Sequence, residues 1–119
     1  MKILIVEDNL SACERYRLAL EATHEMLIAN VVGDARMFLH TDPDIDIVVL
    51  DGLVPMFRNG HPEKTLDLAC ELEWRYPQIL VVAASSDEQI NKELVDCGAH
   101  YAISNKSVTE IETLLTTLT

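Results

Sequence analysis

The sequence has few basic residues, no long hydrophobic run and no glycine-rich tract. Nine lysines and arginines stand against twenty aspartates and glutamates, which gives a formal net charge of −11. A surface this acidic repels phosphate backbones and anionic lipids, so direct binding to nucleic acid or to a membrane is disfavoured. No apolar run is long enough to span a bilayer, and the N-terminal stretch MKILIVEDN does not resemble a signal peptide. We therefore expect a soluble protein, and the unpaired cysteines favour the reducing cytoplasm as its location.

The sequence also lacks paired cysteines. Cys13, Cys70 and Cys97 are an odd number at unrelated spacings and include no CxxC pair. This pattern argues against a disulfide framework and against a zinc site, and it predicts small, buried hydrophobic side chains. No internal repeat or Gly/Ser linker divides the chain. We expect a single domain over residues 1–119, without an output domain.

Five short apolar runs alternate with segments of helical spacing. Three of the five are almost continuously apolar and β-branched, which is typical of parallel strands covered on both faces. The pattern predicts an α/β fold of the (βα)5, flavodoxin-like type: a doubly wound, parallel five-stranded sheet with strand order 2-1-3-4-5. The runs span residues 3–6, 26–32, 46–50, 79–84 and 101–104.

The segments between these runs carry helix start and stop signals. Three pairs have the spacing of a capping box, and Pro62 suits a first helical turn. The second helix is expected to be short and to begin after Gly33, while Pro77 and Gly98 mark the ends of the third and fourth helices. The capping pairs are Ser11/Glu14, Ser86/Gln89 and Ser107/Glu110. The apolar faces are Leu10, Cys13, Tyr16, Leu20; Leu66, Ala69, Leu72, Tyr76; and Val108, Ile111, Leu115, Leu118.

Acidic residues follow two of the predicted strands. Strand 1 runs into Glu7 and Asp8, and strand 3 runs into Asp51. In a doubly wound sheet, ligands bind at the carboxyl ends of the strands where the strand order reverses, so these three carboxylates should converge. Carboxylates crowded together favour a cation, and hard oxygen ligands favour Mg²⁺. Asp51 is then a metal ligand or a nucleophile that accepts a phosphoryl group.

These residues resemble the receiver domains of two-component response regulators. The resemblance spans nearly the whole chain, from KILIVEDN through VVLDGLVP, with Pro55 four residues after the acid, to GAHYAISNKS. It implies that Asp51 accepts a phosphoryl group from a histidine kinase. It also implies that Asp8, Asp51 and the backbone carbonyl of Leu53 bind Mg²⁺ directly, while Glu7 acts through water.

The sequence departs from the receiver pattern at the end of strand 4. Receivers carry a Thr or Ser there, and counting back from the Gly-Ala pair without gaps places Ala83 at this position. Ser85 and Ser86 would replace the hydroxyl only if the loop were displaced. Their spacing favours a simpler role as caps of the fourth helix.

Two further departures lie near the end of the predicted fifth strand. The phosphoryl-contacting lysine of receivers corresponds to Asn105 by ungapped counting, or to Lys106 if the strand carries a bulge. We favour Lys106, which is followed by Ser107 where receivers have proline. The aromatic residue of receivers corresponds to Ala102 or Ile103. The sequence therefore supports phosphorylation of Asp51 better than it supports the switch residues through which receivers usually transmit the signal.

The leading hypothesis is a phosphoryl-accepting switch, not an enzyme beyond the chemistry of its own Asp51. Its partners would be a sensor histidine kinase, a downstream protein or output domain, and a second copy in a homodimer. The fourth helix, fifth strand and fifth helix would form the output surface. The first alternative is a phosphorylation-independent protein-interaction module. The second is a flavin-binding or phosphatase domain, which the acidic loop after strand 1 and Leu53 disfavour.

Overall fold

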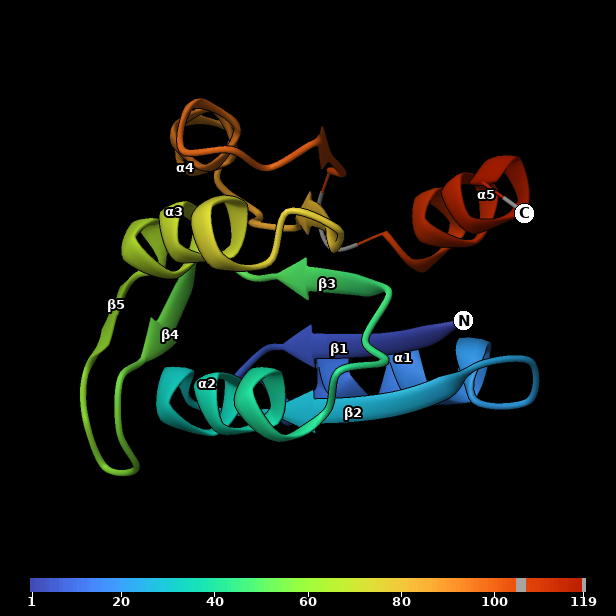
Figure 1. The fold of residues 1–119 in the computed structure, drawn as a ribbon, viewed down its shortest axis with the longest axis horizontal. Coiled ribbons are helices and arrows are strands. Elements are labelled where there is room, and N and C mark those ends of the chain that lie inside the picture. The colour runs from blue at the N-terminus through green and yellow to red at the C-terminus, as the bar shows by residue number, and fades with distance from the viewer. Residues whose placement is uncertain (105–106, 119) are drawn as a thin grey trace.

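The computed structural model describes residues 1–104 and 107–118, and it is built around one five-stranded sheet (Figure 1). All neighbouring strands are parallel, and their order is β2-β1-β3-β6-β7. This is the predicted order, because β6 and β7 are the fourth and fifth strands of the sheet. The strands are β1 (Lys2–Val6), β2 (Glu25–Ala29), β3 (Ile47–Leu50), β6 (Leu80–Ala83) and β7 (Tyr101–Ala102).

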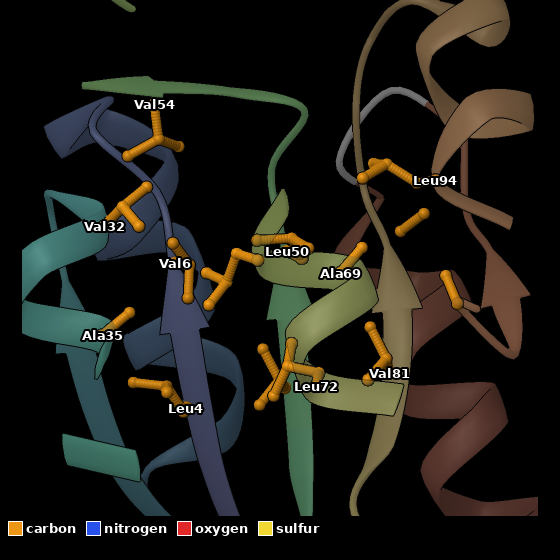
Figure 2. Packing of buried hydrophobic residues seen from close by; sticks show 14 of the residues in the cluster. Leu4, Val6, Val32, Ala35, Leu50, Val54, Ala69, Leu72, Val81 and Leu94 are labelled. Carbon is orange, nitrogen blue, oxygen red and sulfur yellow. The ribbon is translucent and has the colours of Figure 1, made fainter. Parts of the chain in front are cut away.

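Helices cover both faces of the sheet, as the two hydrophobic clusters show. Along β3, Val48 and Leu50 belong to the cluster that includes residues of α2, α3 and α4, while Ile47 and Val49 belong to the cluster with α1 and α5. Figure 2 shows the first cluster, with Leu72 of α3 packed against the sheet. The helices are α1 (Leu10–Leu20), α2 (Val32–Thr41), α3 (Leu66–Arg75), α4 (Glu88–Asp96) and α5 (Val108–Leu118).

A second, two-stranded sheet follows β3, and the sequence did not predict it. The hairpin pairs β4 (Leu53–Pro55) with β5 (Pro62–Lys64) in antiparallel fashion, and it stands at the left in Figure 1. Pro62 lies in this hairpin, so the expectation that it begins the third helix is wrong. The helix begins after Thr65 instead. Asn59 has a φ of 64° in the connecting turn, a left-handed conformation that asparagine tolerates better than most residues.

The N-caps of α1 and α4 differ from the predicted ones by one or two residues. Asn9, not Ser11, caps α1, and its side chain accepts a hydrogen bond from the backbone N–H of Ala12 at 2.9 Å. Asp87, not Ser86, caps α4. Both observed caps have extended backbone and a side-chain oxygen aimed at the first turn, which is what an N-cap requires.

The ends of α3 and α4 agree with the sequence, because Pro77 and Gly98 directly follow their C-cap residues, Tyr76 and Cys97. The remaining helix starts and apolar faces depart from it. The Ser107 hydroxyl accepts from the Glu110 backbone N–H at 3.3 Å, but the Glu110 carboxylate reaches back to Ser104 and so does not complete a capping box. α2 begins at Val32 and contains Gly33, contrary to the expected start after that glycine. Leu10 and Leu118, expected on apolar faces, are exposed at the two outermost helix ends. Within residues 1–104 and 107–118, no helix is both long and apolar enough to cross a bilayer.

Candidate functional site

The three acidic residues that follow β1 and β3 meet at the carboxyl edge of the sheet. One carboxylate oxygen each from Glu7, Asp8 and Asp51 lies within 4.8 Å of the others. Glu7 is 1% exposed and Asp51 is 6% exposed, while Asp8 is half-buried. The predicted convergence is confirmed. Three hard oxygen donors this close suit a small divalent cation such as Mg²⁺.

The sheet itself holds the backbone of two of these acids. The Asp51 N–H donates to the Val6 carbonyl at 2.9 Å, and the Glu7 N–H donates to the Ala29 carbonyl at 3.0 Å. The strand ladder therefore continues one residue beyond β1 and β3, and both acids continue the face that carries α1 and α5. Rigid strand ends position a site more accurately than loops do.

Thr65 forms hydrogen bonds to Asp51 and to the residue after it. The sequence analysis did not identify Thr65 as part of the site. Its hydroxyl donates to the Asp51 carbonyl at 2.7 Å, and its backbone N–H donates to the Gly52 carbonyl at 3.1 Å. Thr65 is 2% exposed. These two bonds connect the residue before α3 directly to the strand end that carries Asp51. No local pattern indicates this, because thirteen residues of hairpin separate the partners.

Gly52 allows α4 to approach the backbone beside Asp51. A Cβ atom at Gly52 would overlap Cγ2 of Ile90 and would come within 2.9 Å of Cβ and Oγ of Ser85. Any larger residue there would push Ser85 and Ile90 away. The glycine therefore couples the position of the β6–α4 loop to the backbone of Asp51.

Asn91 ties three segments together under this loop. Its Nδ2 group donates to the Ser85 carbonyl at 3.0 Å and to the Ile103 carbonyl at 3.1 Å, and its Oδ1 accepts from the Ser85 N–H at 2.8 Å. The side chain is buried within α4. Its position three residues before Leu94, on the buried face, was the only sequence signal for this role.

The strand register defines which residue of β6 stands beside Asp51. Leu50 pairs with Ala83, and the Ala84 N–H donates to the Leu50 carbonyl at 2.9 Å. Ala84 is therefore the neighbour of Asp51, and it packs on the same face of the sheet, whereas Ala83 packs on the opposite face. Neither alanine has a hydroxyl, and the Ser85 hydroxyl accepts from Asp87 N–H at 3.1 Å. The serines shape the loop, while Asp87 is the cap.

Among the comparisons with known proteins, only the one with solved structures bears on the fold. No protein-family model matches the sequence, and no curated protein matches it. Among solved structures, a CheY-like response regulator receiver domain protein from Methanospirillum hungatei superimposes with a TM-score of 0.82 at 15% identity, covering 98% of this chain and 91% of that one. This chain has the receiver fold.

Two other solved structures support the same conclusion. The signal receiver domain of an HD domain-containing protein from Pseudomonas fluorescens has a TM-score of 0.83 at 16% identity, with 98% of this chain and 91% of that chain covered. A response regulator from Thermotoga maritima has a TM-score of 0.78 at 20% identity, with coverage of 98% and 95%. The likeness to the receiver fold thus extends over nearly the whole chain.

Ala102 and Ile103, the two residues expected at the position of the receiver aromatic, differ in exposure. Ala102 is exposed in β7 and lines a groove of about 580 Å³ between β7 and α4, while Ile103 is buried. Tyr101 is exposed and lines a separate groove against α5. None of the described residues that line the groove between β7 and α4 is aromatic.

The remaining candidate residues are only partly accounted for. Leu53 is the first residue of β4, pairs with Lys64 and is 42% exposed. Asn105 and Lys106 lie outside the described residues.

Tyr16 places a buried phenol beneath the acidic site of the receiver fold. The residue is 1% exposed and packs in the cluster of Ile5 and Val49, each two positions before an acid of the site. Its hydroxyl has no hydrogen-bond partner among the described residues. Burial raises the pKa of the Tyr16 phenol, and the charges of Glu7 and Asp51 raise it further.

The substitution Tyr16→Phe is expected to stabilise the protein by about 1 kcal/mol at pH 7, because it removes a buried, unsatisfied hydroxyl. Above about pH 10, the unfolded phenol loses a proton that the folded phenol keeps, so native stability falls as pH rises. The variant should lack this part of the decline. Urea unfolding between pH 7 and 11 measures both effects.

The exposed Tyr101 provides the matched control for this experiment. Tyr101→Phe removes an exposed hydroxyl, so it should leave the stability at pH 7 unchanged. An alkaline decline of equal steepness in the native chain and in Tyr16→Phe would contradict the interpretation.

Proposed function

We propose that this chain is a phosphoryl-accepting signalling domain of a two-component phosphorelay, with Asp51 as the acceptor. The observation that carries the proposal is the convergence of the Glu7, Asp8 and Asp51 carboxylates to within 4.8 Å on a receiver fold. The phosphoryl donor is a phosphohistidine of a sensor histidine kinase. Such a kinase would meet this domain in the cytoplasm.

The chain's own oxygen atoms would hold Mg²⁺. Asp8 and Asp51 are the proposed direct carboxylate ligands, the Leu53 backbone carbonyl is a third ligand, and Glu7 acts through a water molecule. The set fits, because Mg²⁺ prefers a few hard oxygen ligands and keeps several waters. When bound, Mg²⁺ neutralises charge on the oxygens of the transferring group.

In the proposed reaction, a carboxylate oxygen of Asp51 attacks the phosphorus of the phosphohistidine. The O–P bond forms as the P–N bond breaks, and the imidazole nitrogen keeps the bonding electrons. The Gly52 N–H donates to Oδ1 of Asp51 at 2.9 Å, and Thr65 holds the Asp51 carbonyl, so the acceptor is oriented beforehand. Lys106, or Asn105 in the alternative register, is the proposed contact to the phosphoryl group.

The output of the switch would be a change in the surface formed by α4, β7 and α5. Phosphorylation adds roughly −1.5 to −2 charges beside Asp51. Gly52 contacts Ser85 and Ile90, and Asn91 joins the same loop to Ile103, so a physical connection leads from the acceptor to α4 and β7. A downstream protein, an output domain or a second copy of the chain would bind there.

A second candidate function is a phosphorylation-independent interaction module with the same fold. The observation that favours it is the absence of a hydroxyl at both Ala83 and Ala84, together with the exposed Ala102 where receivers carry an aromatic residue. Beryllofluoride with Mg²⁺ distinguishes the two functions. A switch changes the amide NMR signals of α4 and β7, whereas a constitutive module changes only those of the acidic site.

Incubation with Mg²⁺ and acetyl phosphate tests the leading proposal directly. We expect the intact mass to increase by one phosphoryl group, and we expect a chelator to prevent this increase. The adduct should be lost in alkali, as an acyl phosphate is. No mass increase, with Mg²⁺ binding intact, would reject Asp51 as an acceptor and leave the interaction module.

A further inference from the structure

Two of the three cysteines lie on neighbouring helices, away from the acidic site. Cys70 is exposed on α3, contrary to the buried position expected from the sequence. Cys97 is half-buried as the C-cap residue of α4 and packs at the edge of the cluster that includes Ala69 and Leu72 of α3. Cys13 is buried in α1, on the other face of the sheet.

The end of α4 is pressed directly against α3. Gly98, with a φ of 120°, follows Cys97, and a Cβ atom placed on Gly98 would come within 2.8 Å of the Glu73 Cβ. Glu73 lies three residues after Cys70, so the two occupy one face of α3. Cys70 and Cys97 therefore lie on adjoining parts of this interface, and the Cys70 side chain helps to raise the pKa of the Cys97 thiol.

We propose that Cys70 and Cys97 form a reversible disulfide bond that links α3 to the end of α4. Cys97 adjoins Gly98, which packs on Glu73, and Cys70 lies one turn before Glu73, so little backbone movement would bring the two thiols to bonding distance. The third thiol, that of Cys13, is separated from both by the sheet. The proposal is independent of phosphorylation at Asp51.

The bond forms by exchange with a low-molecular-weight disulfide such as oxidised glutathione. The exposed Cys70 thiolate attacks one glutathione sulfur, forms a mixed disulfide and releases one glutathione thiol. Cys97 then attacks the Cys70 sulfur and releases the second. The protein loses two protons and two electrons, which reduce oxidised glutathione to two thiols. Burial, and then the neighbouring Cys70 side chain, raise the pKa of Cys97 to about 11, so Cys97 holds little thiolate at neutral pH and the first attack falls to Cys70.

The new bond would hold the C-terminal end of α4 on α3. Gly98 would remain in place, because its backbone already touches Glu73. α4 also carries Asn91, which contacts the Ser85 loop and Ile103. Oxidation would thus restrict the helix that borders the groove with β7.

Peptide mapping after incubation with oxidised glutathione tests the proposal. We expect the intact chain to lose the mass of two hydrogen atoms, and a reductant to restore the original mass. A cross-linked peptide pair should contain residues 65–75 and 93–106. Trypsin places Cys70 in residues 65–75, Cys97 in residues 93–106 and Cys13 in residues 3–15.

Substitution of each cysteine by serine shows which thiol carries out each step of the exchange. Cys97→Ser should stop at a stable glutathione adduct on Cys70, and Cys70→Ser should yield no internal bond. Cys13→Ser is the matched control and should form the same cross-linked pair as the native chain. A bond through Cys13, a bond only between two chains, or a native chain that keeps one glutathione without any cross-link would overturn the proposal.

Discussion

The substitution Asp51→Asn is expected to abolish the phosphoryl mass increase in acetyl phosphate and Mg²⁺. The asparagine amide has nearly the same shape as the carboxylate but is a far poorer nucleophile, so the buried site keeps its packing and loses its acceptor. The change also removes one of three carboxylates that lie within 4.8 Å of one another. Intact mass spectrometry measures the first effect, and thermal unfolding with and without Mg²⁺ measures the second.

Mg²⁺ should stabilise the native chain much more than it stabilises the Asp51→Asn variant. At a Mg²⁺ concentration ten times the dissociation constant, binding to the folded state alone adds about 1.4 kcal/mol. Asp44→Asn is the matched control, because Asp44 is exposed and precedes the same strand that Asp51 follows. If Asp51→Asn still gained one phosphoryl group, the acceptor would have to be another residue.

The substitution Asn91→Leu should lower the free energy of unfolding by about 3–4 kcal/mol, because leaving buried backbone groups without hydrogen bonds costs about 1–3 kcal/mol each. The change keeps the side-chain volume nearly constant. It leaves the N–H and carbonyl of Ser85 and the carbonyl of Ile103 without their side-chain partner. Urea unfolding gives the size of the loss.

The loop that contains Ser85 should also shift in this variant. The amide NMR signals of Ser85, Gly52 and Ile103 should move most, since Asn91 holds that loop against the acceptor segment. Gln89→Leu makes the same chemical change at an exposed position of α4 and should alter stability by less than about 0.5 kcal/mol. Equal stability of Asn91→Leu and the native chain would show that these bonds contribute little.

The sequence predicted the main sheet and the acidic site because both follow from short-range patterns. The apolar runs that became β1, β3 and β6 are continuous, which is typical of strands covered on both faces. Once those strands are parallel, their carboxyl ends meet at one edge. Glu7, Asp8 and Asp51 were then brought together by topology alone.

The hairpin was missed because its strands carry no periodic signal. Each is three residues long, and all residues of Pro62–Lys64 are exposed, so no alternation of apolar and polar side chains exists to detect. Pro62 equally suits the first turn of a helix. Only pairing with Leu53–Pro55, which depends on the tertiary structure, decides between the two interpretations.

The caps and the hydrogen bonds around the acceptor were missed for different reasons. Each helix start offers several capping residues within two positions, and the backbone conformation decides which one is used. From the sequence alone, Asn9 and Asp87 were therefore as suitable for an N-cap as the nearby serines. Thr65 bonds to Asp51 and Asn91 bonds to Ile103, partners fourteen and twelve residues away, so no local spacing indicates these roles.

The β4–β5 hairpin also makes the chain a convenient carrier for added sequence. The tip of the hairpin, from Phe57 to His61, is exposed. Its two strands pair only with each other, from Leu53↔Lys64 to Pro55↔Pro62, in the part of the chain that the structure describes. Lengthening a flexible surface loop costs only about 0.6 kcal/mol for each doubling of its length. An epitope or a fluorophore-binding peptide inserted at this tip would leave both termini and the order of the main sheet unchanged.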